Sequence, residues 1–218
     1  MRFVQLIFSP TGGVKRAAGL LSAPMAEQPD IIDLSLPLNG TPRFSPEDVC
    51  RIAVPCFGGR VPEIALERLA QTQGGGARAI LLSVYGNRSD EDTLFELKGA
   101  AMRADYVPMA AVRAVAQHSI VPAIAAGRPD EEDARRLAQF GRVIRARLTA
   151  PNAPPLSRAK KALRRRLPRT RAAAQPAGRE AGRTQTQKEM RPASGTRTDF
   201  LTPSVTPAAC QPSAFEMV

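Results

Sequence analysis

Five apolar runs, each closed by glycine, proline or a polar residue, divide the first 150 residues of the chain. Most are continuous rather than alternating and contain β-branched or aromatic residues, which is typical of parallel strands buried on both faces. The expected strands cover residues 2–8, 30–36, 52–57, 77–84 and 105–115. The second run alternates polar and apolar residues toward its end, so we expect it near a sheet edge. The last contains Pro108, which an edge or a bulge tolerates best.

Segments with helical spacing of apolar residues alternate with these runs. The expected helices cover residues 15–21, 62–73, 89–101 and 129–148, with a brief helical turn at 45–48. Ser89 is the expected N-cap of the third helix, because its hydroxyl can accept a hydrogen bond from a first-turn amide and acidic residues follow it. Parallel neighbours need crossover connections, so this order predicts an α/β fold: an open, doubly wound parallel sheet with helices on both faces.

Three loops leave the carboxyl ends of predicted strands and should therefore share one rim of the sheet. They cover residues 9–15, 55–62 and 85–88. Ligands of open α/β sheets bind outside the carboxyl ends of the strands, where the strand order reverses. The clustering of the three loops makes this rim the expected ligand site.

The first loop joins a strand to a helix and is rich in hydroxyl groups and glycine. Its candidate binding residues are Ser9, Thr11, Gly12, Gly13, Val14 and Lys15. Free amides at the start of a helix and the positive end of its dipole suit a phosphate group. Neither the Walker motif nor the G-x-G-x-x-G fingerprint is present. Taken alone the loop is an ordinary β-turn, whereas its position between strand and helix favours an anion site.

The second and third loops each combine glycine with one aromatic and one basic residue. The candidates are Phe57, Gly58, Gly59 and Arg60 in one loop and Tyr85, Gly86, Asn87 and Arg88 in the other. Exposed main-chain groups beside an aromatic ring suit a flat polar heterocycle. The alternatives are a plain βα turn with Phe57 in the core, and a plain turn in which Asn87 adopts the left-handed conformation.

The positive charge of the chain is concentrated toward its end. Residues 1–150 carry 18 Lys and Arg against 16 Asp and Glu, a net charge of +2, whereas residues 151–218 carry 13 against 4, a net charge of +9. The second part is also rich in proline and has almost no apolar periodicity, so it buries too little surface to offset the entropy of ordering. We therefore expect one folded domain at 1–150 and a basic, mostly disordered tail at 151–218.

Cysteine and histidine usage adds little chemistry. Three cysteines without metal-binding spacing fit a reducing compartment, and no apolar run approaches the length of a membrane span. We expect a cytoplasmic protein without a membrane span. His118 is the only histidine, and we favour a hydrogen-bonding role in its loop over proton transfer.

Four motifs follow one another along the expected domain: I-F-S-P-T-G-G-x-K-R-A-A, P-x-F-G-G-R-V-P, V-Y-G-N-R and A-x-H-S-I. In this order they resemble the flavodoxin domain of the flavodoxin-ferredoxin fusion family, over about residues 2–150. The resemblance implies a flavodoxin-like, five-stranded sheet of order 2-1-3-4-5 that binds FMN. It assigns Ser9, Thr11, Gly12 and Gly13 to the phosphate loop, and Phe57, Gly58, Gly59, Tyr85, Gly86 and Asn87 to the ring site.

Two features depart from that family. Its phosphate loops usually end in a hydroxyl residue where this chain has Val14, which implies one hydrogen bond fewer to the phosphate and weaker FMN retention. The family continues into a ferredoxin module with two C-x-x-C-x-x-C-x-x-x-C-P runs, whereas this chain has only Cys210 beyond residue 56. We expect no iron-sulfur cluster, because a cluster needs four ligands. An Arg/Pro/Ala-rich end is also what an out-of-frame reading of a GC-rich gene produces.

The resemblance implies an FMN-dependent electron carrier or a small flavoprotein oxidoreductase, in which the flavin carries the electrons and the protein supplies binding. The expected partner is a redox protein, with a ferredoxin-like protein as the candidate. Two alternatives stay open. The basic tail, above all residues 158–171, could bind nucleic acid or an anionic surface, or the domain could be a degenerate flavodoxin that serves only as an interaction domain.

Overall fold

The computed structural model describes residues 2–25, 29–150 and 153–156, and the backbone of residues 216–217. Strands β1 to β6 are Phe3–Ile7, Asp30–Asp33, Val49–Pro55, Arg78–Tyr85, Val107–Val115 and Glu216–Met217. Helices α1 to α4 are Gly13–Ser22, Glu63–Ala70, Thr93–Arg103 and Glu131–Thr149. The basic segment 158–171 and nearly all of the tail that we expected to be disordered lie outside the described residues.

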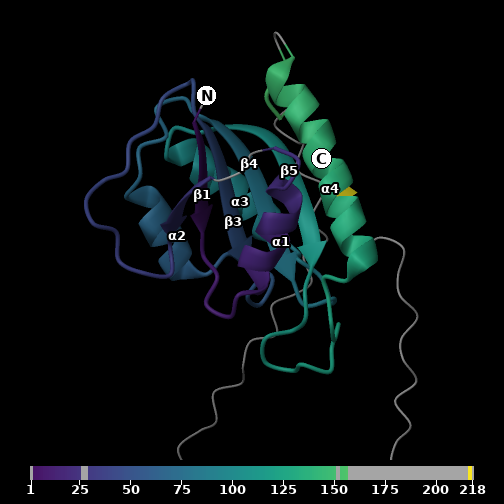
Figure 1. The fold of residues 1–218 in the computed structure, drawn as a ribbon. Helices are drawn as coiled ribbons and strands as arrows, with labels where there is room; N and C mark the ends of the chain where they lie inside the picture. Colours follow the sequence, from purple (N-terminus) through teal and green to yellow (C-terminus); the bar gives the residue numbers. More distant parts are fainter. Residues whose placement is uncertain (1, 26–28, 151–152, 157–215, 218) are drawn as a thin grey trace, which may run out of the picture. The chain divides into compact units, whose positions relative to one another are not determined.

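The first five strands form one parallel sheet in the order β2-β1-β3-β4-β5, which confirms the predicted fold (Figure 1). Helices α1 and α4 contact each other on one face of the sheet, and α2 and α3 contact each other on the opposite face. The short strand β6, which the sequence did not predict, pairs antiparallel with β5. Within the described ranges no helix is long and apolar enough to cross a membrane.

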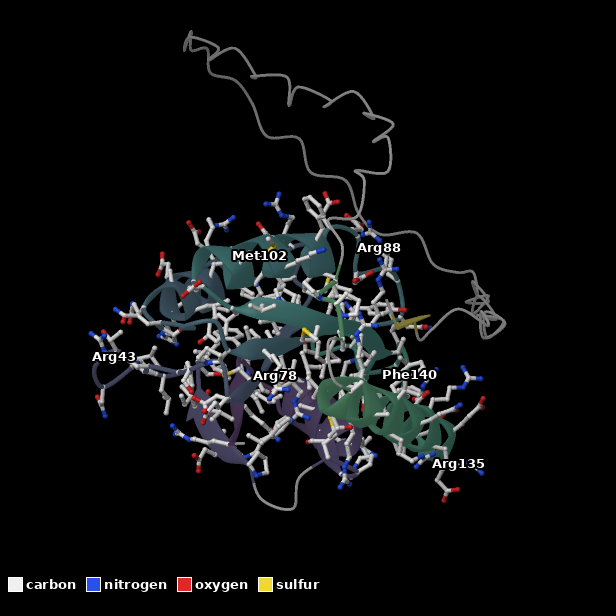
Figure 2. The ribbon with its side chains drawn as sticks, turned by 90° about the horizontal axis from the view of Figure 1, so that it is seen from above. Arg43, Arg78, Arg88, Met102, Arg135 and Phe140 are labelled. Carbon is white, nitrogen blue, oxygen red and sulfur yellow. The ribbon has the colours of Figure 1, made fainter. Side chains whose placement is uncertain are left out.

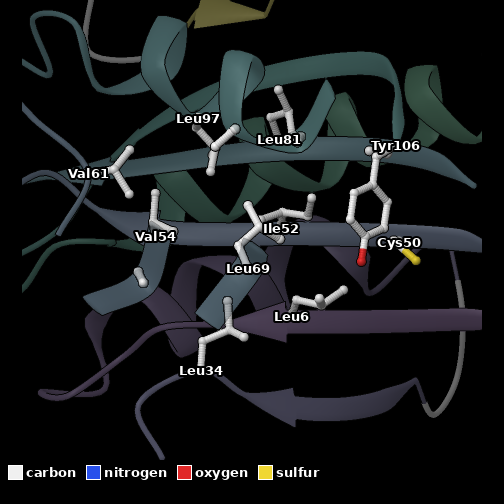
Figure 3. Packing of buried hydrophobic residues seen from close by; sticks show 14 of the residues in the cluster. Leu6, Leu34, Cys50, Ile52, Val54, Val61, Leu69, Leu81, Leu97 and Tyr106 are labelled. Carbon is white, nitrogen blue, oxygen red and sulfur yellow. The ribbon is translucent and has the colours of Figure 1, made fainter. Parts of the chain in front are cut away.

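Side chains that alternate along the strands divide the core into two layers. Ile52 of β3 packs with Leu69 of α2 and Leu97 of α3 in the layer shown in Figure 3. Ala53, the next residue of β3, faces the opposite way and belongs to the layer that contains Leu137 of α4. Burial of one leucine side chain is worth about 1.5–3 kcal/mol. Both faces of the central strands are therefore buried, as the continuous apolar runs predicted.

Two helix predictions were wrong in detail. Residues 45–48 form a hydrogen-bonded turn and no helix: Asp48 N donates to Ser45 O over 3.0 Å, and the Asp48 carboxylate accepts from Ser45 N over 2.9 Å. The N-cap of α3 is Asp92 and not Ser89. The Ser89 hydroxyl accepts instead from Glu91 N over 3.1 Å, which keeps the residues before Asp92 in the loop.

The strand ends follow from local hydrogen bonds. Strand β2 lies at a sheet edge, as predicted, and ends earlier than expected because the Asp33 carboxylate accepts from Ser35 N over 2.7 Å and turns the chain. In β4 and β5 the register shifts between Ala79 and Ile80, opposite Pro108. This bulge accommodates a residue that has no backbone N–H to donate, as the sequence predicted.

Arg51 of β3 is a buried cation within the α1–α4 side of the core. It lies between Gln5 of β1 and Ile80 of β4, is fully buried, and places its guanidinium 5.8 Å from the centre of the Phe3 ring. In the described part of the chain its guanidinium nitrogens have no hydrogen-bond partner. Burial lowers the pKa of Arg51 to about 9, because desolvation disfavours the charged form. At neutral pH the side chain stays charged and therefore costs stability.

We expect Arg51→Met to stabilise the fold, because it removes an unpaired buried charge and keeps a long apolar side chain. The free energy of unfolding should rise by about 1 to 4 kcal/mol. Arg43→Met is the matched control, because Arg43 is exposed at the periphery (Figure 2), and it should change stability by less than about 0.5 kcal/mol. Urea unfolding of both variants measures the difference, and an Arg51→Met protein that unfolds at lower urea than the parent would contradict this account of the buried charge.

Candidate functional site

The loops that follow β1, β3, β4 and β5 meet at the carboxyl end of the sheet and surround two adjoining hollows. Predicted residues that line the first hollow are Ser9, Thr11, Gly13, Val14, Phe57, Gly58, Tyr85 and Gly86. The second hollow is lined by Thr11, Gly12 and Gly13 of the first loop together with Arg16, Arg128 and residues of the loop after β5. The structure thus brings ten of the sequence candidates toward one rim, counted as eight in the first hollow, Gly12 in the second, and Lys15, whose amide bonds to Ser9.

The first loop has the geometry of an anion cradle. Gly12 holds a left-handed conformation with φ 84°, which glycine adopts at little cost, and ends the loop as the N-cap of α1. The Ser9 hydroxyl accepts from Lys15 N over 3.0 Å, and Ser9 O accepts from Gly12 N over 3.3 Å. Among the described residues none accepts a hydrogen bond from the amides of Thr11, Gly13 and Val14. These three amides at the start of a helix are therefore free for an anion.

Side chains around this cradle divide between core and solvent. Val14 is only 4% exposed and packs in the α1–α4 layer, so its contribution to a ligand is its amide and one edge of the first hollow. Lys15 is exposed and lines neither hollow, whereas the exposed Arg16 lines the second. Sequence reasoning placed Lys15 in the site and missed Arg16, which follows it on the first turn of α1.

The second loop is a tight two-residue hairpin. Phe57 N donates to Arg60 O over 2.9 Å and Arg60 N donates to Phe57 O over 3.1 Å, while Gly58 and Gly59 take φ values of 58° and 80°. Positive φ at both central positions defines a type I′ turn, which glycine pairs favour. Phe57 is 48% exposed and lines the first hollow, so it lies outside the core.

Arg60 lines neither hollow and joins this hairpin to Glu96 of α3. Its Nε donates to the Glu96 carboxylate over 3.0 Å, its Nη2 pairs with the same group, and Val61 N donates to Glu96 over 2.9 Å. The hydrogen bond from Arg60 is the main reason why the pKa of Glu96 lies below its ordinary value, although partial burial opposes the shift. On the other side of the hairpin Asp92 N donates to Gly59 O over 3.2 Å.

The third loop contributes its first two candidates to the site. Tyr85 is half-buried and lines the first hollow together with Gly86. Asn87 takes φ 65°, as one alternative reading of the sequence allowed, and Arg88 pairs with Glu91 over 2.8 Å. Neither Asn87 nor Arg88 lines either hollow.

A fourth loop, which sequence reasoning left out of the site, closes the rim after β5. Gln117, His118 and Ser119 line both hollows. The His118 Nδ1 atom accepts from the amides of Ile120 and Val121 over 3.2 and 3.1 Å, which confirms the predicted hydrogen-bonding role in the loop. The signal was available, because this segment also follows the carboxyl end of a predicted strand.

The described side chains that line the two hollows are neutral or positively charged. None of the described residues that line the two hollows is acidic, and Arg16 and Arg128 line the second. The Arg128 guanidinium pairs with the buried Asp133 carboxylate at the start of α4, which fixes one side of this hollow. A low density of negative charge beside free amides suits an anionic ligand.

The described ranges hold no group of three or more His, Cys, Asp or Glu side chains able to bind a metal ion. Cys50 is buried, and burial raises its pKa to about 12, so this thiol is unreactive at neutral pH. Cys56 lines the first hollow and lies 3.5 Å from Ser89 O.

Comparison with known proteins found similar chains among solved structures. No protein-family profile matches the chain, and no curated protein matches it significantly. Similar solved structures include flavodoxins from Streptococcus pneumonia TIGR4 (17% identity, TM-score 0.44, covering 66% of this chain and 98% of that one) and Bacillus cereus (11%, 0.46, 66% and 97%). Another is Megasphaera elsdenii flavodoxin (13%, 0.38, 64% and 97%). The sheet order itself, 2-1-3-4-5, defines a flavodoxin-like fold.

Because the Arg60–Glu96 pair anchors the second loop, we expect the stability of the fold to depend on pH. Glu96→Gln removes the charge that binds Arg60 but keeps an oxygen for Val61 N. A carboxyl group with a lowered pKa stabilises the fold above its unfolded value, 4.5, and loses this effect as the pH falls through the folded value. Wild-type protein should therefore resist urea better than Glu96→Gln at about pH 7, and the difference should shrink as the pH falls below 4.5 toward the lowered pKa of Glu96.

Urea midpoints across this pH range measure the effect. Glu132→Gln is the control, because Glu132 belongs to an exposed ion pair with Arg136 on α4 and should show little difference at any pH. A difference for Glu96→Gln that does not change between neutral and acid pH would show that the Arg60–Glu96 pair does not hold the hairpin through its charge.

Proposed function

We propose that this protein binds FMN at the rim and acts as an electron-transfer protein or a small flavoprotein oxidoreductase. The observation that carries the proposal is the cradle of three free amides at Thr11, Gly13 and Val14, located where the strand order reverses between β1 and β3. In sheets of this order the flavin site lies at that switch point. FMN supplies the electron chemistry when it is bound, and the protein supplies binding and electrostatics.

The residues present fit the phosphate of such a ligand. Thr11 and Gly13 line both hollows, Val14 lines the first, and Arg16 lines the second as the adjacent cation. The positive end of the α1 dipole lies at the same loop. Val14 supplies an amide in place of a hydroxyl, so we expect a weaker phosphate contact than a hydroxyl residue there would give.

The first hollow fits a flat heterocycle. Phe57 and Tyr85 supply aromatic faces, while Gly58 and Gly86 leave main-chain groups accessible beside them. The Phe57–Arg60 hairpin is held by Glu96, so Phe57 starts from a preorganised backbone. We assign to Arg60 and Arg88 the role of holding their loops through ion pairs, and no contact with the flavin ring.

Partner and location are parts of the same proposal. The exposed apolar side chains Phe57, Ile120 and Val121 gather in the loops of the rim and favour docking of a redox protein there, with a ferredoxin-like protein as the candidate. The free thiols Cys50 and Cys56 fit a reducing, cytoplasmic compartment.

Two glycine substitutions test the phosphate assignment as a matched pair. Gly12→Ala forces a side chain into the left-handed conformation at φ 84°, at a cost of about 1 to 2 kcal/mol, although nothing lies within 4 Å of the added atom. Gly19→Ala adds the same atom within α1, where nothing lies within 4 Å, φ is not left-handed and neither hollow is lined. We expect Gly12→Ala to raise the Kd for FMN at least about fivefold, and Gly19→Ala to leave it nearly unchanged.

Flavin fluorescence titrations with FMN and riboflavin measure both constants. Because riboflavin lacks the phosphate, its affinity should be equal in both variants. Equal FMN affinities for the wild type and Gly12→Ala would reject the first loop as the phosphate site, and a loss of riboflavin binding in Gly12→Ala would show that the substitution had disturbed more than the phosphate contact.

A further inference from the structure

His118 lies where the two hollows adjoin. It comes from the loop after β5, lines both hollows, and is half-buried there. No other titratable side chain of the described residues lines both. Its surroundings in this position are the glycine-rich first loop on one side and Gly86, after β4, on the other.

The hydrogen bonds of the loop fix the tautomer of this imidazole. Nδ1 accepts from Ile120 N over 3.2 Å and from Val121 N over 3.1 Å. A nitrogen that accepts cannot carry the proton, so in the neutral ring the proton is on Nε2. Two bonds from the backbone also restrict rotation of the ring, and His118 N donates to Ile124 O over 3.0 Å to hold the loop itself.

The contact with Gly86 restrains the imidazole ring. A Cβ atom at Gly86 would lie 2.5 Å from His118 Cδ2, so a side chain at this position would push the ring away. The next nearest atoms are Cγ and Cβ, so the Cβ–Cγ–Cδ2 side of His118 packs against Gly86, and Nε2, which is bonded to Cδ2, is not one of these contacts. Nδ1 is on the edge that faces its own loop. The absence of a side chain at Gly86 and the two backbone bonds together preorganise a single donor.

We propose that His118 binds the flavin nucleus by donating a hydrogen bond from Nε2 to an acceptor atom of the isoalloxazine or its ribityl attachment. The inference rests on the proposed function. The ring system, rather than the phosphate, is the ligand group because the imidazole packs against Gly86, which lines the hollow of Phe57 and Tyr85 and not the second hollow. Free amides already serve the phosphate at the other end.

A donor in this place affects the reduced ligand more than the oxidised one. Two-electron reduction adds negative charge to the ring system, and a preorganised N–H group stabilises charge that develops opposite it. None of the described residues that line the hollows is acidic, and the Asp133 carboxylate beside the second hollow is paired with Arg128. His118 should therefore raise the two-electron midpoint potential of bound FMN.

His118→Asn separates this role from a role in the loop alone. An asparagine oxygen accepts hydrogen bonds from amides two and three residues on, so the turn at Ile120 and Val121 keeps its acceptor. The ring and its Nε2 donor are lost. Val121→Ala is the control, because Val121 belongs to the same loop, is 45% exposed and lines neither hollow.

The test uses the full chain. Fluorescence titration gives the Kd for FMN and for riboflavin, and dithionite titration gives the midpoint potential of bound FMN. In His118→Asn the affinity for both oxidised flavins should fall about threefold to tenfold. If reduced FMN loses about tenfold more affinity than oxidised FMN, the midpoint falls by about 30 mV. Val121→Ala should match the wild type in all three measurements.

Each other result overturns the proposal. Equal constants and potentials for His118→Asn and wild type reject the donor while the FMN function stands. A loss confined to FMN, with riboflavin unchanged, assigns His118 to the phosphate instead. The same changes in Val121→Ala show that the loop and not the imidazole matters. A wild-type protein that binds neither flavin refutes the proposed function, and the inference about His118 fails with it.

Discussion

The site depends on one constraint: β1 must lie between β2 and β3 while both of its faces are buried. The chain leaves β1 for α1 on one face of the sheet and leaves β3 for α2 on the opposite face. The two loops therefore diverge, and the rim opens between them. A strand order without this reversal would send both loops the same way and leave no hollow at the start of α1.

The rim is assembled by short-range rules and held by long-range contacts. The first two loops contain the residues that their backbones require, a left-handed Gly12 and the pair Gly58–Gly59 of a type I′ turn. Their positions relative to one another depend on contacts between elements: Arg60 with Glu96 of α3, and His118 with Gly86. The polar chemistry of the rim is thus mostly main-chain, which suits a protein whose reactive group is a bound cofactor.

The structural features that could be predicted from the sequence are those that neighbouring residues along the chain determine. Continuous apolar runs predicted the parallel strands, Pro108 predicted an edge or a bulge, and the order of strand, glycine loop and helix predicted where the loop before α1 lies. Contacts across long separations left no local pattern. The Glu96 partner of Arg60 lies 36 residues away, so Arg60 looked like a ligand contact when its side chain supports the hairpin. The N-cap prediction for α3 was wrong because the Ser89 hydroxyl accepts from the nearer amide of Glu91.

The central claim is that the cradle at the start of α1 holds the phosphate of FMN. Calorimetric titration of the full chain with FMN, repeated with riboflavin and with FMN in excess inorganic phosphate, tests it most directly. We expect saturable binding of one FMN per chain and weaker binding of riboflavin. Inorganic phosphate should weaken the binding of FMN and leave that of riboflavin unchanged. Absence of FMN binding, or equal affinity for the two flavins with no effect of phosphate, would contradict it.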